Sequence, residues 1–315
     1  MEDVKKLLEQ TLDNLQNLAN DPKALSGIPT GFIDLDRVLG GFNNSDLIVV
    51  GSRPAMGKTA LLVNMALKQS VNYHIPVLFY TFEKTKNQIV RLILSSIAEI
   101  DGYKIGNGML AAEDWDAIMN KAKVLNDEVP LYIVDNPSAK IKDFCLKVKK
   151  DMSQTGAKIV YIDNLHLFSS SLGYQSRYEE ISACTRELKH LAKELDIPIV
   201  MASQINRNPE HRDAKSIEYY RPFMYDLRDS GTICEDSNVV ILLDRPELKY
   251  HSYEDSEGNN IRGLTEVIIA KNHMGREDVV RLRFKPEFAR FEDWKEFDEL
   301  EIIKGMDFHT EESQF

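Results

Sequence analysis

One short stretch constrains the fold more than any other part of the chain. Residues 52–59 read Ser-Arg-Pro-Ala-Met-Gly-Lys-Thr and lie between an apolar run at 47–51 and a helical pattern at 60–67. A strand, a tight loop and a helix in this order suit a phosphate-binding loop, because backbone N–H groups and the helix dipole converge on phosphate oxygens. The pattern G-x-x-x-x-G-K-[ST] begins with glycine, where this chain has Ser52. Serine is small, so we interpret the loop as nearly intact.

Each important position of this loop has an expected task. Gly57 lets the backbone approach a phosphate closely. Lys58 reaches the β- and γ-phosphates, and the hydroxyl of Thr59 holds Mg²⁺. The alternative is a chance Gly-Lys-Thr at the start of a helix, which the flanking strand and helix patterns disfavour. The predicted phosphate-loop residues are Ser52, Arg53, Pro54, Ala55, Met56, Gly57, Lys58, Thr59 and Ala60.

Three further apolar runs end in polar residues. Glu83 ends the run at 77–83, Asp163 the run at 158–163, and Gln204 the run at 198–204. Ligands of parallel α/β sheets bind at the carboxyl ends of the strands, so Glu83 is a candidate for positioning a water molecule. It could instead be only a charge at the start of a helix expected at 87–100. After a phosphate loop, an apolar strand ending in Asp is typical of a Walker B strand, whose Asp orients Mg²⁺ and its water shell.

The composition limits the class of protein. The chain has 315 residues, 43% hydrophobic content and a net charge of −11. Such a charge argues against a surface that coats duplex DNA indiscriminately, although a channel could still gather positive residues at one inner loop. The three cysteines are far apart, which predicts neither a disulfide framework nor a zinc site and favours a reducing cytoplasm. No apolar run is long enough to span a membrane, and the seven histidines have no metal-ligand spacing.

Strand and helix patterns alternate along the chain, which predicts an α/β protein of the P-loop class with a mainly parallel central sheet flanked by helices. Residues 2–19 carry an apolar stripe on one helix, which could pack on its own domain or on a neighbouring subunit. We therefore divide the chain into 1–25 and 26–315. Cys184 has the spacing of a core residue. Polar loops are expected at 169–177 and 226–231, and a hairpin at 265–271 and 279–284.

Five separated motifs, in the same order, resemble the DnaB-family replicative DNA helicases. These are Gly27–Asp36, Arg53–Ala60, Tyr161–Leu165, Ser203–Arg207 and Asp226–Gly231. The resemblance covers about residues 4–290. The sequence Arg-Pro-x-Met-Gly-Lys-Thr distinguishes this family from recombinases of the same fold. We expect only the family's linker helix and motor domain here, without its N-terminal helical domain.

The resemblance implies a RecA-like fold, a homo-hexameric ring, ATP sites between neighbours and single-stranded DNA in the central channel. It implies that Glu83 is the catalytic glutamate, that Asp163 is the Walker B acid, and that Gln204 senses the γ-phosphate. ATP and Mg²⁺ are the implied cofactors, with Thr59 and Asp163 as metal-site residues. The implied DNA-binding residues are Arg228, Asp229 and Gly231, and Arg177 is a further candidate. A primase or a helicase loader is a possible partner.

Two positions depart from the family's pattern. The family usually has Glu where this chain has Asp229. Its finger motif, which acts on the neighbouring subunit, reads Lys-x-Arg, whereas this chain has Lys271-Asn272-His273. Lys271 therefore matches and the arginine does not. Lys271 could carry the charge alone, Arg276 in the same hairpin could substitute, or the ATPase could be weak.

Two functions compete. The first is a ring helicase that couples ATP hydrolysis to movement along single-stranded DNA during replication. The second is a regulatory or loading module that binds ATP, hydrolyses it slowly or not at all, and assembles with a replication partner. A recombinase-like filament is a weaker third possibility. The helix at 1–25 is expected to dock on a neighbouring subunit in the first case.

Overall fold

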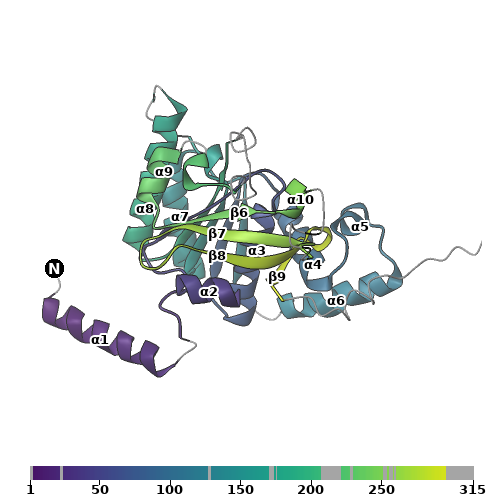
Figure 1. Ribbon diagram of the computed structural model, residues 1–315, viewed down its shortest axis with the longest axis horizontal. Coiled ribbons are helices and arrows are strands. Elements are labelled where there is room, and N and C mark those ends of the chain that lie inside the picture. The colour runs from purple at the N-terminus through teal and green to yellow at the C-terminus, as the bar shows by residue number, and fades with distance from the viewer. Residues whose placement is uncertain are drawn as a thin grey trace, which may run out of the picture.

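Figure 1 shows the computed structural model of the chain, a twisted sheet with helices packed on its faces. The structure describes residues 3–21, 24–126, 129–169, 174, 176–206, 221–227, 230–250, 254, 258 and 260–295. Within this part of the chain one sheet has nine strands, in the order β3-β2-β4-β5-β1-β6-β7-β8-β9. The strands are β1 Leu47–Ser52, β2 Val77–Thr81, β3 Leu131–Asp135, β4 Ile159–Asp163, β5 Ile199–Gln204, β6 Val239–Asp244, β7 Leu264–Asn272, β8 Asp278–Lys285 and β9 Arg290–Asp293.

In this spatial order, β3, β2, β4, β5, β1 and β6 run parallel to one another. Strands β7, β8 and β9 then extend the sheet beyond β6, and each is antiparallel to its neighbour. This confirms the predicted mainly parallel sheet, and β7 with β8 forms the predicted hairpin. The α-helices are α1 Val4–Asn20, α2 Ile33–Leu39, α3 Lys58–Asn72, α4 Lys86–Ala98, α5 Gly102–Asn107, α6 Ala112–Asn126, α7 Ile141–Thr155, α8 Arg177–Leu195, α9 Ser230–Asp236 and α10 Glu247–Tyr250. Short 3-10 helices occur at η1 Leu165–Leu167, η4 Met224–Asp226 and η5 Pro286–Phe288.

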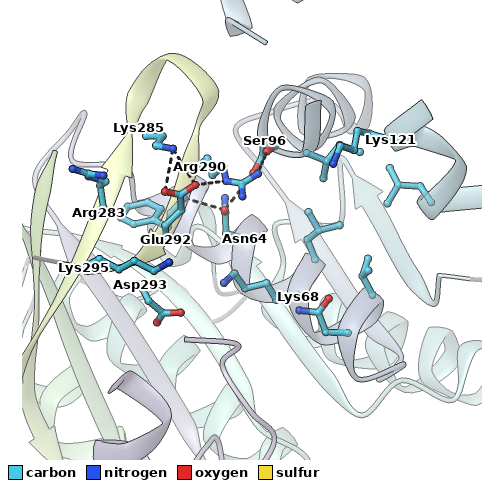
Figure 2. A pocket seen from close by; sticks show the side chains of 16 residues that line it. Asn64, Lys68, Ser96, Lys121, Arg283, Lys285, Arg290, Glu292, Asp293 and Lys295 are labelled. Atoms are coloured by element: carbon cyan, nitrogen blue, oxygen red, sulfur yellow. Dashed lines mark hydrogen bonds and ion pairs between the residues drawn. The ribbon is translucent and has the colours of Figure 1, made fainter. Parts of the chain in front are cut away.

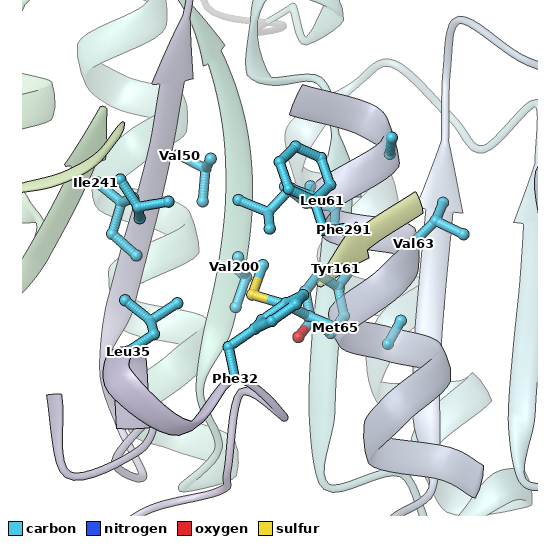
Figure 3. Close-up of a cluster of buried hydrophobic side chains, with 14 of the residues drawn as sticks. Phe32, Leu35, Val50, Leu61, Val63, Met65, Tyr161, Val200, Ile241 and Phe291 are labelled. Carbon is cyan, nitrogen blue, oxygen red and sulfur yellow. The ribbon is translucent and has the colours of Figure 1, made fainter. Parts of the chain in front are cut away.

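The two faces of the sheet have separate apolar cores, because successive side chains of a strand point to opposite sides. Ile48 and Val50 of β1 pack in the core that contains α3. Figure 3 shows Leu61 and Met65 of α3 in that core, beside Phe32. Leu47 and Val49 face the other core, which contains side chains of α7 and α8. Burial on both faces explains the continuous apolar runs of the parallel strands.

The N-terminal helix stands apart from the rest of the molecule (Figure 1). Asp3 caps α1 by accepting a hydrogen bond from the backbone N–H of Lys5. The apolar stripe predicted for this helix is exposed, with relative accessibilities of 56% for Leu8 and 54% for Leu12. Tertiary packing supplies most of the stability of a helix in water. The stripe of α1 is therefore a face without packing in the described part of the chain.

Local predictions failed where a helix replaced an expected loop. Arg177 is the first residue of α8, because the Ser176 side chain accepts a hydrogen bond from Glu179 N–H and caps the helix there. Ser230 begins α9 within the stretch expected to be a polar loop, and the buried Ile233 supplies the packing that stabilises this helix. Strand β2 ends at Thr81, before Glu83. The short β9 was missed altogether, whereas Cys184 is buried as predicted.

Candidate nucleotide-binding site

The parallel register brings the predicted site residues to one edge of the sheet. Ser52 at the end of β1 lies opposite Gln204 at the end of β5. Thr81 at the end of β2 lies opposite Asp163 at the end of β4. The carboxyl ends of neighbouring strands meet at this edge, where ligands of such sheets bind. At or just after these ends lie the phosphate loop, Glu83, Asp163 and Gln204.

The loop itself has the backbone that phosphate binding requires. Gly57 has a φ of 94° and forms the N-cap of α3. A Cβ at this position would lie 3.0 Å from a ring carbon of Phe284 and 3.1 Å from one of Phe291. Glycine is therefore required at this position for two reasons: the positive φ suits only glycine well, and the two rings leave too little room for a Cβ. Ser52, by contrast, is a buried strand residue in β1, so its backbone does not need glycine.

Lys58 lies among the groups that matter for phosphate chemistry. Its Nζ donates to the carbonyl oxygen of Ser203 at 3.0 Å. Burial lowers the pKa of Lys58, while the negative charges of Asp163 and Glu83 oppose that shift. A buried ammonium with a lowered pKa is a group that an incoming anion stabilises. The lysine is therefore prepared for phosphate before any ligand binds.

Thr59 and Asp163 form the part of the site suited to a metal ion. The hydroxyl of Thr59 donates to Oδ2 of Asp163 at 2.7 Å. The other carboxylate oxygen, Oδ1, is buried and has no hydrogen-bond partner among the described residues. A buried carboxylate oxygen without a partner is costly unless another group satisfies it. A hydroxyl and a carboxylate are oxygen donors of the kind that Mg²⁺ takes alongside water and phosphate oxygens, so the residues present fit this ion.

Glu83 and Gln204 occupy the remaining positions at this edge. Glu83 is exposed, and one of its carboxylate oxygens accepts a hydrogen bond from the side-chain amide of Asn164, the residue after Asp163. Gln204 is half-buried at the end of β5. Asn164 was not identified from the sequence as a site residue. The sequence held a signal for it, because Asn164 directly follows Asp163, the polar residue at the end of a predicted strand.

Lys271 lies far from the phosphate loop of its own chain. It pairs with Val240 near the start of β6, whereas the phosphate loop is level with the end of that strand. Its Nζ donates to the carbonyl oxygens of Cys234 and Ser237, each at 2.6 Å, and so caps the C-terminal end of α9. Of the other hairpin cations, Arg276 is exposed and forms an ion pair with Asp278 at 3.0 Å. The structure therefore does not bring Lys271 together with Lys58 within one chain.

The predicted DNA-binding residues are only partly covered. Arg228 and Asp229 lie outside the described residues. Gly231 is in α9 and faces the hydroxyl of Tyr178, so a larger residue would collide there. Arg177 donates to the backbone carbonyl of His166 at 2.6 Å and pairs with Glu180.

Arg245 and Phe284 beside the phosphate loop were missed by sequence reasoning. The Arg245 guanidinium lies 5.0 Å from the centre of the Phe284 ring, and that ring stacks on Phe291 at 4.3 Å. Arg245 is buried, and its Nε has no partner among the described residues. Arg245 directly follows β6, so the rule of strand ends could have found it. Phe284 reaches the loop only through the antiparallel extension of the sheet, which no local pattern indicates.

A glycine-containing loop between a parallel strand and a helix, a buried lysine beside it and a threonine hydroxyl bonded to a buried aspartate are the features of a P-loop nucleotide-binding protein of the RecA-like class. Residues 27–293 match the family described as the DnaB-like helicase C terminal domain. The chain belongs to this family.

Known relatives and solved structures agree with this placement. The replicative DNA helicase DnaB of Geobacillus stearothermophilus is 36% identical over 304 residues, which are 96% of this chain and 64% of that protein. DnaC of Bacillus subtilis (strain 168), also a replicative DNA helicase, is 33% identical over 96% of this chain and 65% of its own length. The ATPase domain of G40P superposes with a TM-score of 0.83 at 26% identity, covering 94% of this chain and all of that domain. A DnaB-like replicative helicase, described with its interactions with primase, superposes with a TM-score of 0.80 at 26% identity, covering 94% of this chain and 68% of that one.

The chain thus spans somewhat less than two thirds of the length of these helicases. Within the described residues no helix is both long and apolar enough to cross a membrane. Nor do the described residues contain a cluster of histidines, cysteines and acids that could hold a metal ion by themselves.

Proposed function

We propose that the chain is the motor of an ATP-hydrolysing ring helicase that moves along single-stranded DNA during replication, in the cytoplasm. The observation that carries this proposal is the buried, unsatisfied Oδ1 of Asp163 beside Thr59 and Lys58. Leaving such an oxygen without a partner costs about 1–3 kcal/mol. Mg²⁺ bound together with nucleotide would give this oxygen a partner and offset the cost.

The residues of the site divide the chemistry among them. Lys58 and the loop N–H groups bind the β- and γ-phosphates. Thr59 and Asp163 hold Mg²⁺, which supplies charge neutralisation at the phosphate oxygens. Glu83 orients the attacking water and accepts its proton, with its carboxylate held by Asn164. Gln204 reads the presence of the γ-phosphate.

We infer that the chain works as a homo-hexamer, because parts of the site are unsuited to one subunit alone. Lys271 and Arg276 lie at the end of the sheet opposite the phosphate loop, so we assign any role they have in ATP hydrolysis to the site of another copy. The exposed stripe of α1 needs apolar side chains to pack against, and several are exposed on α4, α5, α6 and the connection between α5 and α6. They are Val90, Tyr103, Met109, Trp115 and Met119. Residues 1–25 are therefore assigned as a linker that docks on a neighbouring subunit.

The DNA contacts are assigned to Arg228, Asp229, Gly231 and Arg177. Arg177 begins α8 and Gly231 lies in α9, and Arg228 and Asp229 directly precede α9 in the sequence. Arginine contacts to phosphate make binding sequence-tolerant and salt-sensitive. A primase is a possible partner, since a solved DnaB-like relative is described with its interactions with primase; a helicase loader is another.

The decisive experiment measures the ATPase rate with and without single-stranded DNA, alongside the particle mass in solution. A ring helicase gives particles of six subunits and hydrolysis that DNA stimulates. Leu8→Ser/Leu12→Ser should reduce the particle mass, whereas the matched change Thr11→Ser on α1 should not. Tight ATP binding without hydrolysis, with or without DNA, would support the regulatory module instead.

A further inference from the structure

A cavity of about 640 Å³ lies between the C-terminal half of α3, the helices α4 and α6, and the strands β8 and β9 (Figure 2). It is separate from the phosphate loop. An α-helix rises about 1.5 Å per residue, so Lys68 in the cavity lies roughly 15 Å along α3 from Lys58. The nucleotide chemistry proposed above makes no use of this cavity.

The cavity walls are joined by hydrogen bonds. Asn64 of α3 donates to the carbonyl of Ala289 at 2.9 Å and accepts from the backbone N–H of Phe291 at 3.1 Å. Arg290 donates to the carbonyl of Ser96 in α4 at 2.9 Å. These bonds fasten β9 to both helices. The cavity is therefore a pre-formed site, of a size typical for bound ligands.

The lining is strongly cationic in an otherwise acidic protein. Two of its side chains are acidic, Glu292 and Asp293. Six are cationic: Lys68, Lys121, Arg283, Lys285, Arg290 and Lys295. Lys285 and Arg290 are already paired with Glu292, at 3.1 and 2.7 Å, and both also pair with Glu99. The capacity to bind an additional anion therefore depends on the other cations.

Three lysines around the cavity remain for such an anion. Among the described residues, Lys68 donates to the carbonyl of Gly31 at 2.9 Å and lies 4.2 Å from the centre of the Phe32 ring. Lys121 and Lys295 are exposed and have no ion pair with any described residue. Burial lowers the pKa of Lys68, which an approaching carboxylate would reverse.

The cavity also has an apolar part, formed by Leu67, Val71, Ile97 and Leu125. A ligand that satisfies both parts carries carboxylates and apolar groups together. A free inorganic anion would leave this apolar surface uncovered. An acidic peptide with interleaved apolar side chains matches both the charge and the surface.

Such a peptide directly follows the cavity in the sequence. Residues 296–303, which are outside the described part of the chain, read Glu-Phe-Asp-Glu-Leu-Glu-Ile-Ile. They begin immediately after Lys295, which lines the cavity. An extended chain spans at most about 3.3–3.6 Å per residue, so Glu299 can lie within roughly 14 Å of Lys295. The tether gives the segment a high effective concentration at the cavity.

We propose that residues 296–303 bind in this cavity. Their carboxylates lie against Lys68, Lys121 and Lys295, and their apolar side chains lie against the apolar part of the cavity that contains Leu67. The proposal goes beyond the proposed motor function and does not depend on it. It assigns the C-terminal segment a binding site on its own domain.

The test is amide hydrogen exchange of the full chain at low salt. Replacing Glu296, Asp298, Glu299 and Glu301 with their amides should make exchange in residues 64–72 and 112–126 several-fold faster. Replacing Glu311 and Glu312 with Gln is the matched control and should leave exchange unchanged. High salt should remove the difference in exchange rate between the unmodified chain and the amide variant, because the contacts are electrostatic and partly exposed.

A charge-reversal experiment keeps the proposal testable if a variant is unstable. Lys121→Glu/Lys295→Glu should speed exchange in the same helices, and adding Glu296→Lys/Glu299→Lys should restore protection. The proposal is overturned if the amide variant exchanges like the unmodified chain. It is equally overturned if the protection of residues 64–72, which lie outside the surface proposed for α1, depends on protein concentration and is lost in Leu8→Ser/Leu12→Ser, because α1 of a second copy would then be the occupant.

Discussion

At the scale of single residues, Lys58 shows how the site combines stability with chemistry. Burial lowers its pKa, so the folded state disfavours the charged form that phosphate binding requires. Below that lowered pKa, the charged lysine makes the fold less stable than a neutral side chain would. Phosphate provides the missing negative charge. The free-energy cost of burying the charged ammonium is therefore offset only when a ligand is bound.

We expect Lys58→Met to lower ATP hydrolysis by several orders of magnitude, because the lysine neutralises charge in the transition state. The same change should leave the unfolding temperature unchanged or raise it, since a buried charge is replaced by an apolar chain. Steady-state hydrolysis and thermal unfolding of the same preparations check both parts. An active Lys58→Met protein would refute the assignment of the phosphate loop.

The hydrogen bond between Glu83 and Asn164 leads to a second prediction at this scale. Glu83→Gln should retain ATP binding but lose turnover, because an amide cannot accept the proton of the attacking water. Asn164→Ala should lower turnover less, because it releases the carboxylate without removing it. Nucleotide affinity and turnover are measured for each variant. If Glu83→Gln loses binding and turnover equally, Glu83 has a structural role.

At the scale of elements, β9 is held to β8 and α4 by charged groups that predict a pH dependence. Burial alone would raise the pKa of Glu292, but hydrogen bonds and charges from Lys285 and Arg290 outweigh it, and the pKa is lowered. A lowered carboxyl pKa stabilises the fold fully above the ordinary value of 4.5, and this contribution is lost as the pH falls below that value.

We therefore expect Glu292→Gln to lower the free energy of unfolding by about 1–3 kcal/mol at neutral pH. The difference from the unmodified chain should shrink as the pH falls through 4.5 and below. Chemical denaturation at several pH values measures it. Glu113→Gln, at an exposed position in the first turn of α6, is the control. A difference that stays constant with pH would mean that the carboxylate charge contributes nothing.

The elements also show what the sequence alone could predict. Apolar runs of parallel strands are continuous because both faces are buried, so β1, β4, β5 and β6 were found with the polar residues at their ends. Strand β2 was also found, but it ends at Thr81, before Glu83. Helix α9 was not, since its stability comes from packing of Ile233 rather than from the propensities of Ser230 and Gly231. Phe284 was missed for a related reason. Its place beside Gly57 follows from tertiary pairing across the antiparallel strands.

At the scale of the whole molecule, the question is how one chain completes the site of another. His273 is exposed at the turn of the β7–β8 hairpin, and histidine is shorter than arginine and lacks its planar fork. The candidates for a cation from this hairpin are therefore Lys271 and Arg276. Lys271 is bound to the end of α9, whereas Arg276 is exposed, so Arg276→Ala should lower hydrolysis more than Lys271→Ala.

Mixed rings test whether the hairpin acts across the interface. Lys271→Ala/Arg276→Ala subunits retain Lys58, and Lys58→Ala subunits retain the hairpin, so their mixture contains some interfaces with both intact halves. We expect the mixture to hydrolyse ATP faster than either variant alone, since a cation supplied from a neighbour is worth roughly 10³–10⁵ in rate in P-loop enzymes. Adding the two hairpin substitutions to the Lys58→Ala subunits should abolish the recovery. If Lys271→Ala instead acted by removing the cap of α9, the defect would lie in the fold of the same subunit, and mixing with another variant would not restore activity. If Lys271→Ala/Arg276→Ala alone hydrolyses ATP at the unmodified rate, the hairpin supplies no cation to the neighbouring site.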